Sequence, residues 1–344
     1  MKLAVDAIEY CTKNMPRFNH VSLSSSHFRD AGASPITAAS FLIADAKEYI
    51  RWILDRGLKI DEFAPRMSFL LQLYTDIFEE VARLRALRRL WARLLREHFG
   101  AKDPRSYMFR TALCAGGISF SSKREPYLNL VRGALGLLAC VLGGGQTIWM
   151  SGIDEGYEIP TPEALKLSVR AAQIIAEETS IPDVVDPLAG SYYMEWLTDE
   201  MERRIKEKIV KIDEMGGALA AIKRGYYSKE ITKEAFEWHR KIQSGETAWI
   251  GENRYVEEVE KTEIKIYEPS SKRRRKALES LTKTKRSRNN VRVKEALTAL
   301  EKAVESYENL MPYFIEAVKA YVTVSEISDV LKKTYGEFEQ ITAI

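Results

Sequence analysis

The chain has few cysteines, and it lacks the patterns that would place it in or across a membrane. Its three cysteines, Cys11, Cys114 and Cys140, stand far apart among 344 residues and form no CxxC pair. An odd number of widely spaced thiols argues against a disulfide framework and against a zinc site, and favours a reducing compartment. The sequence also has no apolar run of membrane length and no cleavable signal pattern at its start. We therefore expect a cytoplasmic globular protein without a membrane partner and without a metal site of its own.

The signatures of several common function classes are missing as well. No G-x-S-x-G surrounds Ser24–Ser26, which argues against serine hydrolysis. The glycines at 143–145 precede a predicted strand, whereas a phosphate-binding loop follows one, so we interpret them as a tight turn. A net charge of +3 does not require a nucleic-acid partner. The basic segment 272–288 has no interleaved aromatic residues for base stacking, which favours a solvated, partly helical linker over an RNA-binding patch.

What is present is a repeated pattern of a strand followed by a helix. We predict strands near 19–25, 66–72, 106–113 and 146–151, with helices near 34–56, 75–99, 126–142 and 162–179. Successive units of this kind imply parallel strands, because each helix must return the chain to the same edge. Four units make half of an eight-unit barrel and leave two unpaired edges. The chain then completes itself against another chain, is a fragment, or forms a small open sheet.

Helical patterns dominate after about residue 190. An initial helix is predicted over 2–15, and the later ones over 192–214, 217–224, 228–243, 291–307, 312–322 and 324–335. Glycines at 216–217, 225 and 245 separate several of them as helix stops. We predict three domains: 1–190 with the strands, 191–268 as a helical belt, and 269–344 as the basic linker with the last helices.

A histidine follows the first predicted strand. His27 comes directly after the run Ser22-Leu23-Ser24-Ser25-Ser26, which ends in three serines, and just before a helical pattern. Barrels place their chemistry at this end of the strands, where a histidine can hydrogen-bond a carbonyl or carry a proton. A surface or packed histidine at a strand end is the alternative, with equal weight on position alone.

An arginine and a serine open the second predicted strand. Arg66 and Ser68 are two residues apart, so on a strand they would point to the same face and suit a phosphate. The alternative is a structural ion pair of Arg66 with Asp61 or Glu62, to which we give equal weight.

Glycines and carboxylates follow the third and fourth predicted strands. Gly116 and Gly117 would let a flat ligand approach the backbone. The rival role for the preceding Cys114, a catalytic thiol, is disfavoured because no nearby cation lowers its pKa. The run from Ser151 to Gly156 offers a carboxylate for ribose hydroxyls. Capping of the next helix is its alternative role, although Thr161 is the better cap.

Taken together, these segments resemble the large, substrate-binding subunit of the methylmalonyl-CoA mutase family of acyl-CoA mutases. The resemblance runs along nearly the whole chain. It is carried, in order, by SLSSSHFRDAGAS (22–34), IDEFAPRMSF (60–69), ARLRALRRLW (82–91), DPLAGSYYMEWLTDE (186–200), SGETAWIGENRY (244–255) and ENLMPYFIEAVKA (308–320).

The resemblance implies an α/β fold: the second half of a (β/α)8 barrel threaded by CoA, followed by a helical belt. The chain would start just before the fifth strand. The implied reaction is a radical carbon-skeleton isomerisation such as methylmalonyl-CoA to succinyl-CoA, with adenosylcobalamin as cofactor. No DxHxxG motif is present, so another chain would supply the cobalt ligand. The implied partners are an acyl-CoA substrate, a separate cobalamin-binding subunit and a chain supplying the first half-barrel, in a hetero-oligomer.

The resemblance also assigns roles to single residues. It makes His27 the catalytic residue that hydrogen-bonds the thioester carbonyl. It places Arg17, Arg66 and Ser68 on CoA, with Arg17 standing where the family has a lysine. On the cofactor side it places Gly117, Ser151, Glu155 and Gly156.

Several positions depart from the family pattern. Ser25-Ser26 stand where the family has glycine and tyrosine, and Ala112 and Cys114 where it has histidine and glutamine. Ile118 replaces a tryptophan, and Ser151 an asparagine. These changes leave a second hypothesis open, a non-catalytic relative that acts as scaffold or assembly partner of a mutase complex.

Overall fold

The computed structural model describes residues 1–117, 121–157, 159–257 and 270–337. Their contacts divide the chain into two compact units, each described by itself below. One unit joins residues 1–20 to the C-terminal helices, and the other runs from residue 21 through the sheet and the helices that follow it. The predicted boundary near 268 lies outside the described residues, and the three predicted domains stay a prediction. Residues 1–20, which we assigned to the first of them, pack with the C-terminal helices.

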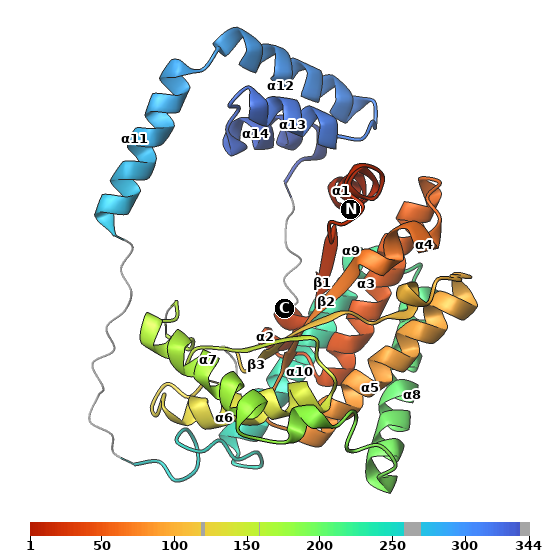
Figure 1. Cartoon of the computed structure of the whole chain (residues 1–344), viewed down its shortest axis with the longest axis vertical. Helices are drawn as coiled ribbons and strands as arrows, with labels where there is room; N and C mark the ends of the chain where they lie inside the picture. The colour runs from red at the N-terminus through yellow and green to blue at the C-terminus, as the bar shows by residue number, and fades with distance from the viewer. Residues whose placement is uncertain (118–120, 158, 258–269, 338–344) are drawn as a thin grey trace. The chain divides into compact units, whose positions relative to one another are not determined.

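The larger unit contains a sheet of four parallel strands in sequential order (Figure 1). The α/β class and the parallel pairing are therefore confirmed. The strands are β1 (Val21–Ser24), β2 (Met67–Leu73), β3 (Thr111–Ala115) and β4 (Thr147–Met150). The second has the predicted length, shifted by one residue, and the other three are shorter than predicted. The third begins later because Pro104 and the Asp103 side chain, which accepts from the Arg105 amide, turn residues 104–107 into a 3-10 helix.

Among the described residues, helices cover one face of this sheet and not the other. Residues alternate along each strand, and those on one side, such as Phe69, Leu71 and Leu113, are 0% exposed. The opposite side, which we call the open face, carries mainly small or polar residues: Ser22, Ser24, Ser68, Leu70, Gln72, Ala112, Cys114, Thr147 and Trp149. Ser22, Thr147 and Trp149 are exposed there, whereas Gln72 and Cys114, toward its carboxyl end, are only 3% and 9% exposed. The strands thus bury one side and present the other.

The covering layer consists of α3 (Pro35–Asp55), α5 (Ile77–Arg93), α6 (Leu128–Leu142) and α7 (Pro162–Glu177). Two of these helices begin with the same device. Ser34 and Thr161 each accept a hydrogen bond from a backbone amide of the first turn, and a proline occupies the first helical position. Glycines let α6 approach the sheet, since a Cβ at Gly133 would lie 2.2 Å from the Sδ of Met150.

The remaining helices of this unit are the short α2 (Ser26–Asp30) and α4 (Ile60–Phe63), then α8 (Tyr192–Glu214), α9 (Ala218–Lys223) and α10 (Tyr226–Gln243). The other unit contains α1 (Lys2–Asn14), α11 (Ser271–Ser287), α12 (Asn290–Glu305), α13 (Met311–Lys319) and α14 (Val324–Tyr335). The basic segment that we expected to be partly helical is the continuous helix α11, and none of its residues is buried. No helix of the described residues is long and apolar enough to cross a membrane.

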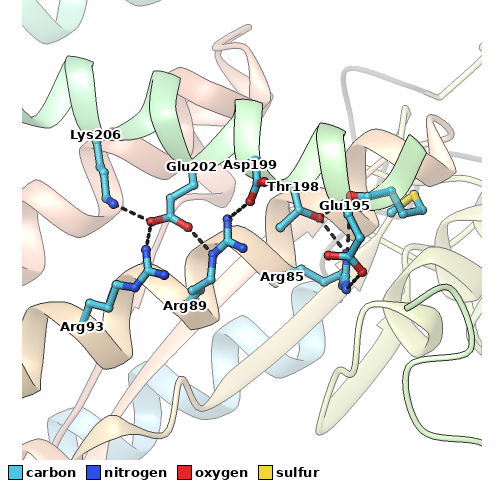
Figure 2. Close-up of polar contacts among 9 residues, drawn as sticks. Arg85, Arg89, Arg93, Glu195, Thr198, Asp199, Glu202 and Lys206 are labelled. Atoms are coloured by element: carbon cyan, nitrogen blue, oxygen red, sulfur yellow. Dashed lines mark hydrogen bonds and ion pairs between the residues drawn. The ribbon is translucent and has the colours of Figure 1, made fainter. Parts of the chain in front are cut away.

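A ladder of charged side chains joins α8 to α5 (Figure 2). Glu202, at its centre, is only 3% exposed and accepts hydrogen bonds from Arg89 and, at 2.6 Å, from Arg93. Lys206 completes the cage around this carboxylate. One turn or more away, Arg85 binds Glu195 at 2.7 Å and the Thr198 hydroxyl at 2.9 Å. The arginine stripe of α5, which the sequence shows as its polar face, is therefore the docking surface for α8.

We predict that Glu202→Gln destabilises the protein more than Glu200→Gln on the same helix. The first change leaves three cations without their buried counter-charge and should cost about 2 kcal/mol, discounted because the cations are part-exposed. Glu200 pairs only with arginines of its own helix and should matter little. Burial alone would raise the pKa of Glu202, but hydrogen bonds from Lys206 and Arg89 outweigh it and hold that pKa low.

Urea unfolding at several pH values measures this effect. The stability that Glu202 adds at neutral pH should fade as the pH drops below about 4, where the carboxylate of the unfolded chain is protonated. Equal unfolding midpoints for the two variants at pH 7 would contradict the importance of the ladder.

Candidate functional site

His27 lies on α2, directly beyond the carboxyl end of β1, and its side chain is exposed. The next residue of α2, Phe28, anchors this helix to α3 and α10 of the same unit. The ring of Phe28 packs edge-on against Phe41, with centroids 5.5 Å apart, and against Tyr227 at 6.0 Å. Because its neighbour is anchored in the core, His27 is presented from a rigid turn rather than from a loose loop.

A buried ionic cluster holds this turn to the end of β2. Glu80 of α5 is 1% exposed, and its carboxylate accepts from the Arg29 guanidinium at 3.4 Å and from the Tyr74 amide at 3.2 Å. Its other oxygen pairs with Arg83, which is 0% exposed and donates to the Gln72 carbonyl at 2.7 Å. The Arg29 guanidinium also lies 4.4 Å above the Tyr74 ring. The carboxyl ends of β1 and β2 are therefore tied together through one glutamate.

Arg66 and Ser68 lie at the opposite, amino end of the sheet. Ser68 is the second residue of β2, and its hydroxyl donates to the Val21 carbonyl at 3.1 Å. Arg66 precedes the strand, in the 3-10 turn Ala64–Arg66, so our expectation that both residues share a strand face was wrong. Pro65 sets that turn by its fixed backbone angle.

The structure does not support the ion-pair alternative for Arg66. Asp61 accepts from the backbone amides of Lys102 and Asp103 and from the Ser106 hydroxyl. Glu62 accepts from the Lys59 amide in a capping arrangement. In the part of the chain that the structure covers, neither carboxylate forms an ion pair with Arg66. Arg17 is exposed in the segment after α1 and belongs to the other unit.

The glycines after β3 make room for a side chain of this protein. Gly116 and Gly117 have φ angles of +90° and +153°, in the region that favours glycine. A Cβ at Gly117 would lie 1.6 Å from the Nε2 of Gln72, which donates to the Gly116 carbonyl at 2.5 Å. We expected these glycines to admit a flat ligand, and the structure shows Gln72 packed against one of them. A cavity of about 20 Å³ beside them is roughly large enough for one water molecule.

Ser151, Glu155 and Gly156 lie just beyond β4, in line with the same sheet edge. The Ser151 hydroxyl is 3.4 Å from the Cys114 thiol, and its amide donates to the Ala115 carbonyl at 2.9 Å. The helix that follows is capped by Thr161, as expected, and Asp154 rather than Glu155 supports that cap at 2.7 Å. Glu155 is thus left available for a ligand, and its role stays a prediction.

The thiols are poor nucleophile candidates. The pKa of Cys114 is raised to about 11: burial is the largest cause, the hydrogen bond with Ser151 opposes it, and the charges of Glu155 and Asp30 add to it. Burial also raises the pKa values of Cys11 and Cys140. This agrees with our preference against a catalytic Cys114.

We therefore predict that the native protein reacts slowly with thiol reagents at pH 8. Thiolate is the reactive form, and all three cysteines are buried with raised pKa values. Titration with a chromogenic disulfide should find three thiols only after unfolding in urea. Rapid reaction of one thiol in the native protein would mean that Cys114 is accessible and activated.

Two features of this edge escaped the sequence analysis. Gln72 sits inside the apolar run Met67–Leu73, and its alternation onto the open face is the only signal that could have singled it out. The Arg29–Glu80 contact joins residues far apart in sequence, and no local pattern announces it. Ile118 lies outside the described residues, whereas Ala112 and Cys114 lie on the open face. Within the described ranges, no three His, Cys, Asp or Glu side chains gather into a possible metal site.

Comparison with known proteins decides the family. The family model described as methylmalonyl-CoA mutase matches residues 1–337. The chain belongs to the methylmalonyl-CoA mutase family. It is 37% identical to the 2-hydroxyisobutanoyl-CoA mutase large subunit of Aquincola tertiaricarbonis over 341 residues. This alignment covers 99% of this chain and 60% of that subunit.

Other relatives give the same picture. Identity to the human mitochondrial methylmalonyl-CoA mutase is 37% over 339 residues, covering 98% of this chain and 45% of the human protein. Identity to the Escherichia coli methylmalonyl-CoA mutase is 36%, covering 98% and 47%. The chain therefore spans about half the length of the curated relatives it matches.

Proposed function

We propose that this chain forms the second half of a (β/α)8 barrel that binds an acyl-CoA and isomerises its carbon skeleton with adenosylcobalamin. The observation that carries the proposal is the open face: Ser68 lies at its amino end, Arg66 directly before β2, and His27 just beyond its carboxyl end on α2. Parallel sheets are almost always covered on both sides. Four further strands, from a partner chain or from residues outside this sequence, would close the open face into a barrel interior.

The residues of the open face suit a ligand that runs along the strands. Barrel interiors are normally filled with bulky branched side chains. Here Ser22, Ser24, Ser68, Ala112 and Thr147 leave space instead. The seven residues of β2 span about 20 Å at the usual rise per residue, which is enough to separate a phosphate site from a thioester site. Arg66 and the Ser68 hydroxyl would bind the CoA phosphates, and His27 would contact the acyl group.

At the carboxyl edge, His27 would hydrogen-bond the thioester carbonyl and hold it while the acyl group migrates. Adenosylcobalamin supplies the radical chemistry when bound, with its cobalt ligand on another chain. The edge fits such a group: Glu155 is not consumed by the cap at Thr161, and the buried Oε1 of Gln72 has no partner among the described residues. Ser151, Gly117 and Gly156 would complete the contact. The closed barrel would exclude water from the reacting atoms.

The phosphate site makes the first test. We expect Arg66→Ala to weaken acyl-CoA binding by about tenfold or more, because it removes a charge-assisted hydrogen bond. Arg105→Ala is the matched control. Arg105 lies on the neighbouring 3-10 turn, but its guanidinium already binds Asp103 at 2.7 Å. Calorimetric titration of the full chain with isobutanoyl-CoA measures both. Equal affinity in the two variants would remove Arg66 from the site.

The histidine makes the second test, in the complex assembled with its cobalamin subunit. We expect His27→Ala to lower turnover of methylmalonyl-CoA or 2-hydroxyisobutanoyl-CoA far more than it changes CoA affinity, because the contact to the carbonyl matters during migration. Unchanged turnover in an active complex would remove His27 from catalysis. A wild-type complex that assembles and binds acyl-CoA, yet turns over neither substrate, would favour the scaffold hypothesis, in line with Ala112 and Cys114 on the open face.

A further inference from the structure

Gln72 carries a buried carbonyl oxygen without a donor. The residue is 3% exposed and lies near the carboxyl end of β2, where it pairs with Cys114 across the ladder. Its Nε2 donates to the Gly116 carbonyl, and since that carbonyl can only accept, the orientation of the amide is fixed. The Oε1 atom has no hydrogen-bond partner within the described residues. Such buried acceptors are rare and costly in folded proteins, so this one requires an explanation.

The backbone next to Gln72 is shaped around its amide. Any side chain at Gly117 would collide with Nε2, because its Cβ alone would come within 1.6 Å. Position 117 therefore requires glycine, both for its backbone angle and because the Gln72 amide occupies the space that a side chain would need. An apolar residue at position 72 would leave no buried polar side-chain atom in need of a hydrogen bond. The amide is held in place, and its oxygen has no hydrogen-bond donor among the described residues.

Two serine hydroxyls that directly follow β1 also lack hydrogen-bond partners. Ser25 is 0% exposed and Ser26 is 9% exposed, and neither Oγ has a partner among the residues that the structure places. Ser25 occupies the cap position of α2 but makes no side-chain cap bond. Its amide donates to the Leu70 carbonyl at 2.9 Å, and Ser24 pairs with Leu70. Ser26, the first residue of α2, and Gln72 of β2 each follow that pair by two residues, and α2 contacts β2. Three buried oxygens without partners thus belong to adjacent strand ends.

The charges around these oxygens narrow the ligand chemistry. The Oδ1 of Asp30 and the Nε2 of Gln72 lie 2.9 Å and 1.6 Å from the position that a Cβ at Gly117 would take, so Asp30 is next to the amide. The charges of Glu155 and Asp30 also help to raise the pKa of Cys114, the ladder partner of Gln72, although burial is the larger cause. Two carboxylates would repel an anionic group placed here. A hydroxyl group avoids this repulsion, since it can donate to Oε1 and also exchange hydrogen bonds with the serines.

We propose that Gln72, Ser25 and Ser26 form a binding site for a ligand hydroxyl group, with Gln72 Oε1 as its acceptor. The chemistry has two possible sources at this edge: the hydroxyls of a nucleoside ribose or the hydroxyl of a 2-hydroxyacyl thioester. The choice of these two sources rests on the proposed function. In either case the site adds a determinant of ligand choice that a relative lacking this amide would not have.

Calorimetric titration of the full chain with two matched pairs of ligands tests the site. One pair is 2-hydroxyisobutanoyl-CoA and isobutanoyl-CoA, and the other is adenosine and 2′,3′-dideoxyadenosine. The wild type should prefer the hydroxyl-bearing member of one pair by about tenfold, the value of one hydrogen bond to a buried acceptor. Gln72→Met should abolish that preference by weakening only the hydroxylated ligand. The pair that shows the effect identifies the source.

Gln146→Met is the matched control, because it removes an amide at the opposite end of the sheet, where Gln146 accepts from Thr111. It should leave the preference intact, and thermal melting should show both variants folded. No preference in the wild type, or a preference that survives in Gln72→Met, overturns the inference. If isobutanoyl-CoA binds through Arg66 but neither pair shows a preference for the hydroxyl-bearing ligand, the hydroxyl site is overturned and the proposed function stands. Absent binding of both thioesters would count against the proposed function, while the nucleoside pair would still decide the site.

Discussion

The carboxylate of Glu80 is the contact on which the arrangement of the carboxyl edge depends. It is buried between Arg29 and Arg83 and also binds the backbone at the end of β2. Removing it would leave two buried guanidinium groups without their nearest counter-charge, a far more damaging change than the loss of a surface pair. The position of α2, and with it His27, follows from Arg29, while Arg83 fixes the backbone of Gln72. The histidine and the amide are thus held by one ionic cluster.

The two faces of the sheet have different tasks. The covered face is built from large apolar residues that pack on α3, α5 and α6, and the ladder around Glu202 adds α8 to this layer. Because of that packing, the open face does not need large apolar residues to hold the helices. Its residues are therefore small or polar, and the groups suited to a ligand stand at its two ends. Stability and recognition are separated by the simple alternation of side chains along each strand.

Much of the fold could be predicted because it is local. Strand and helix periods, a proline after Ser34 and Thr161, and helix-stopping glycines all act within a few residues. The turn at 104–107 and the position of Arg66 before β2 were missed because a single proline reshapes each strand start. The grouping of α1 with the C-terminal helices rests on Asp6, which accepts from the Leu310 amide at 3.1 Å, and no sequence pattern reveals such a contact. Of the candidate site residues, His27, Ser68 and Glu155 could be proposed because they lie at the ends of predicted strands. Gln72 could be recognised only from its contacts in the folded structure.

The sequential strand order also bears on how the protein is made. Each strand finds its neighbour in the unit that comes immediately before or after it along the chain. During synthesis, β1 and β2 can therefore pair while β4 is still untranslated, and every later unit adds to an existing border. No strand has to be inserted between two that are already joined. In vectorial growth of this kind, each new strand covers the edge of the strand made before it.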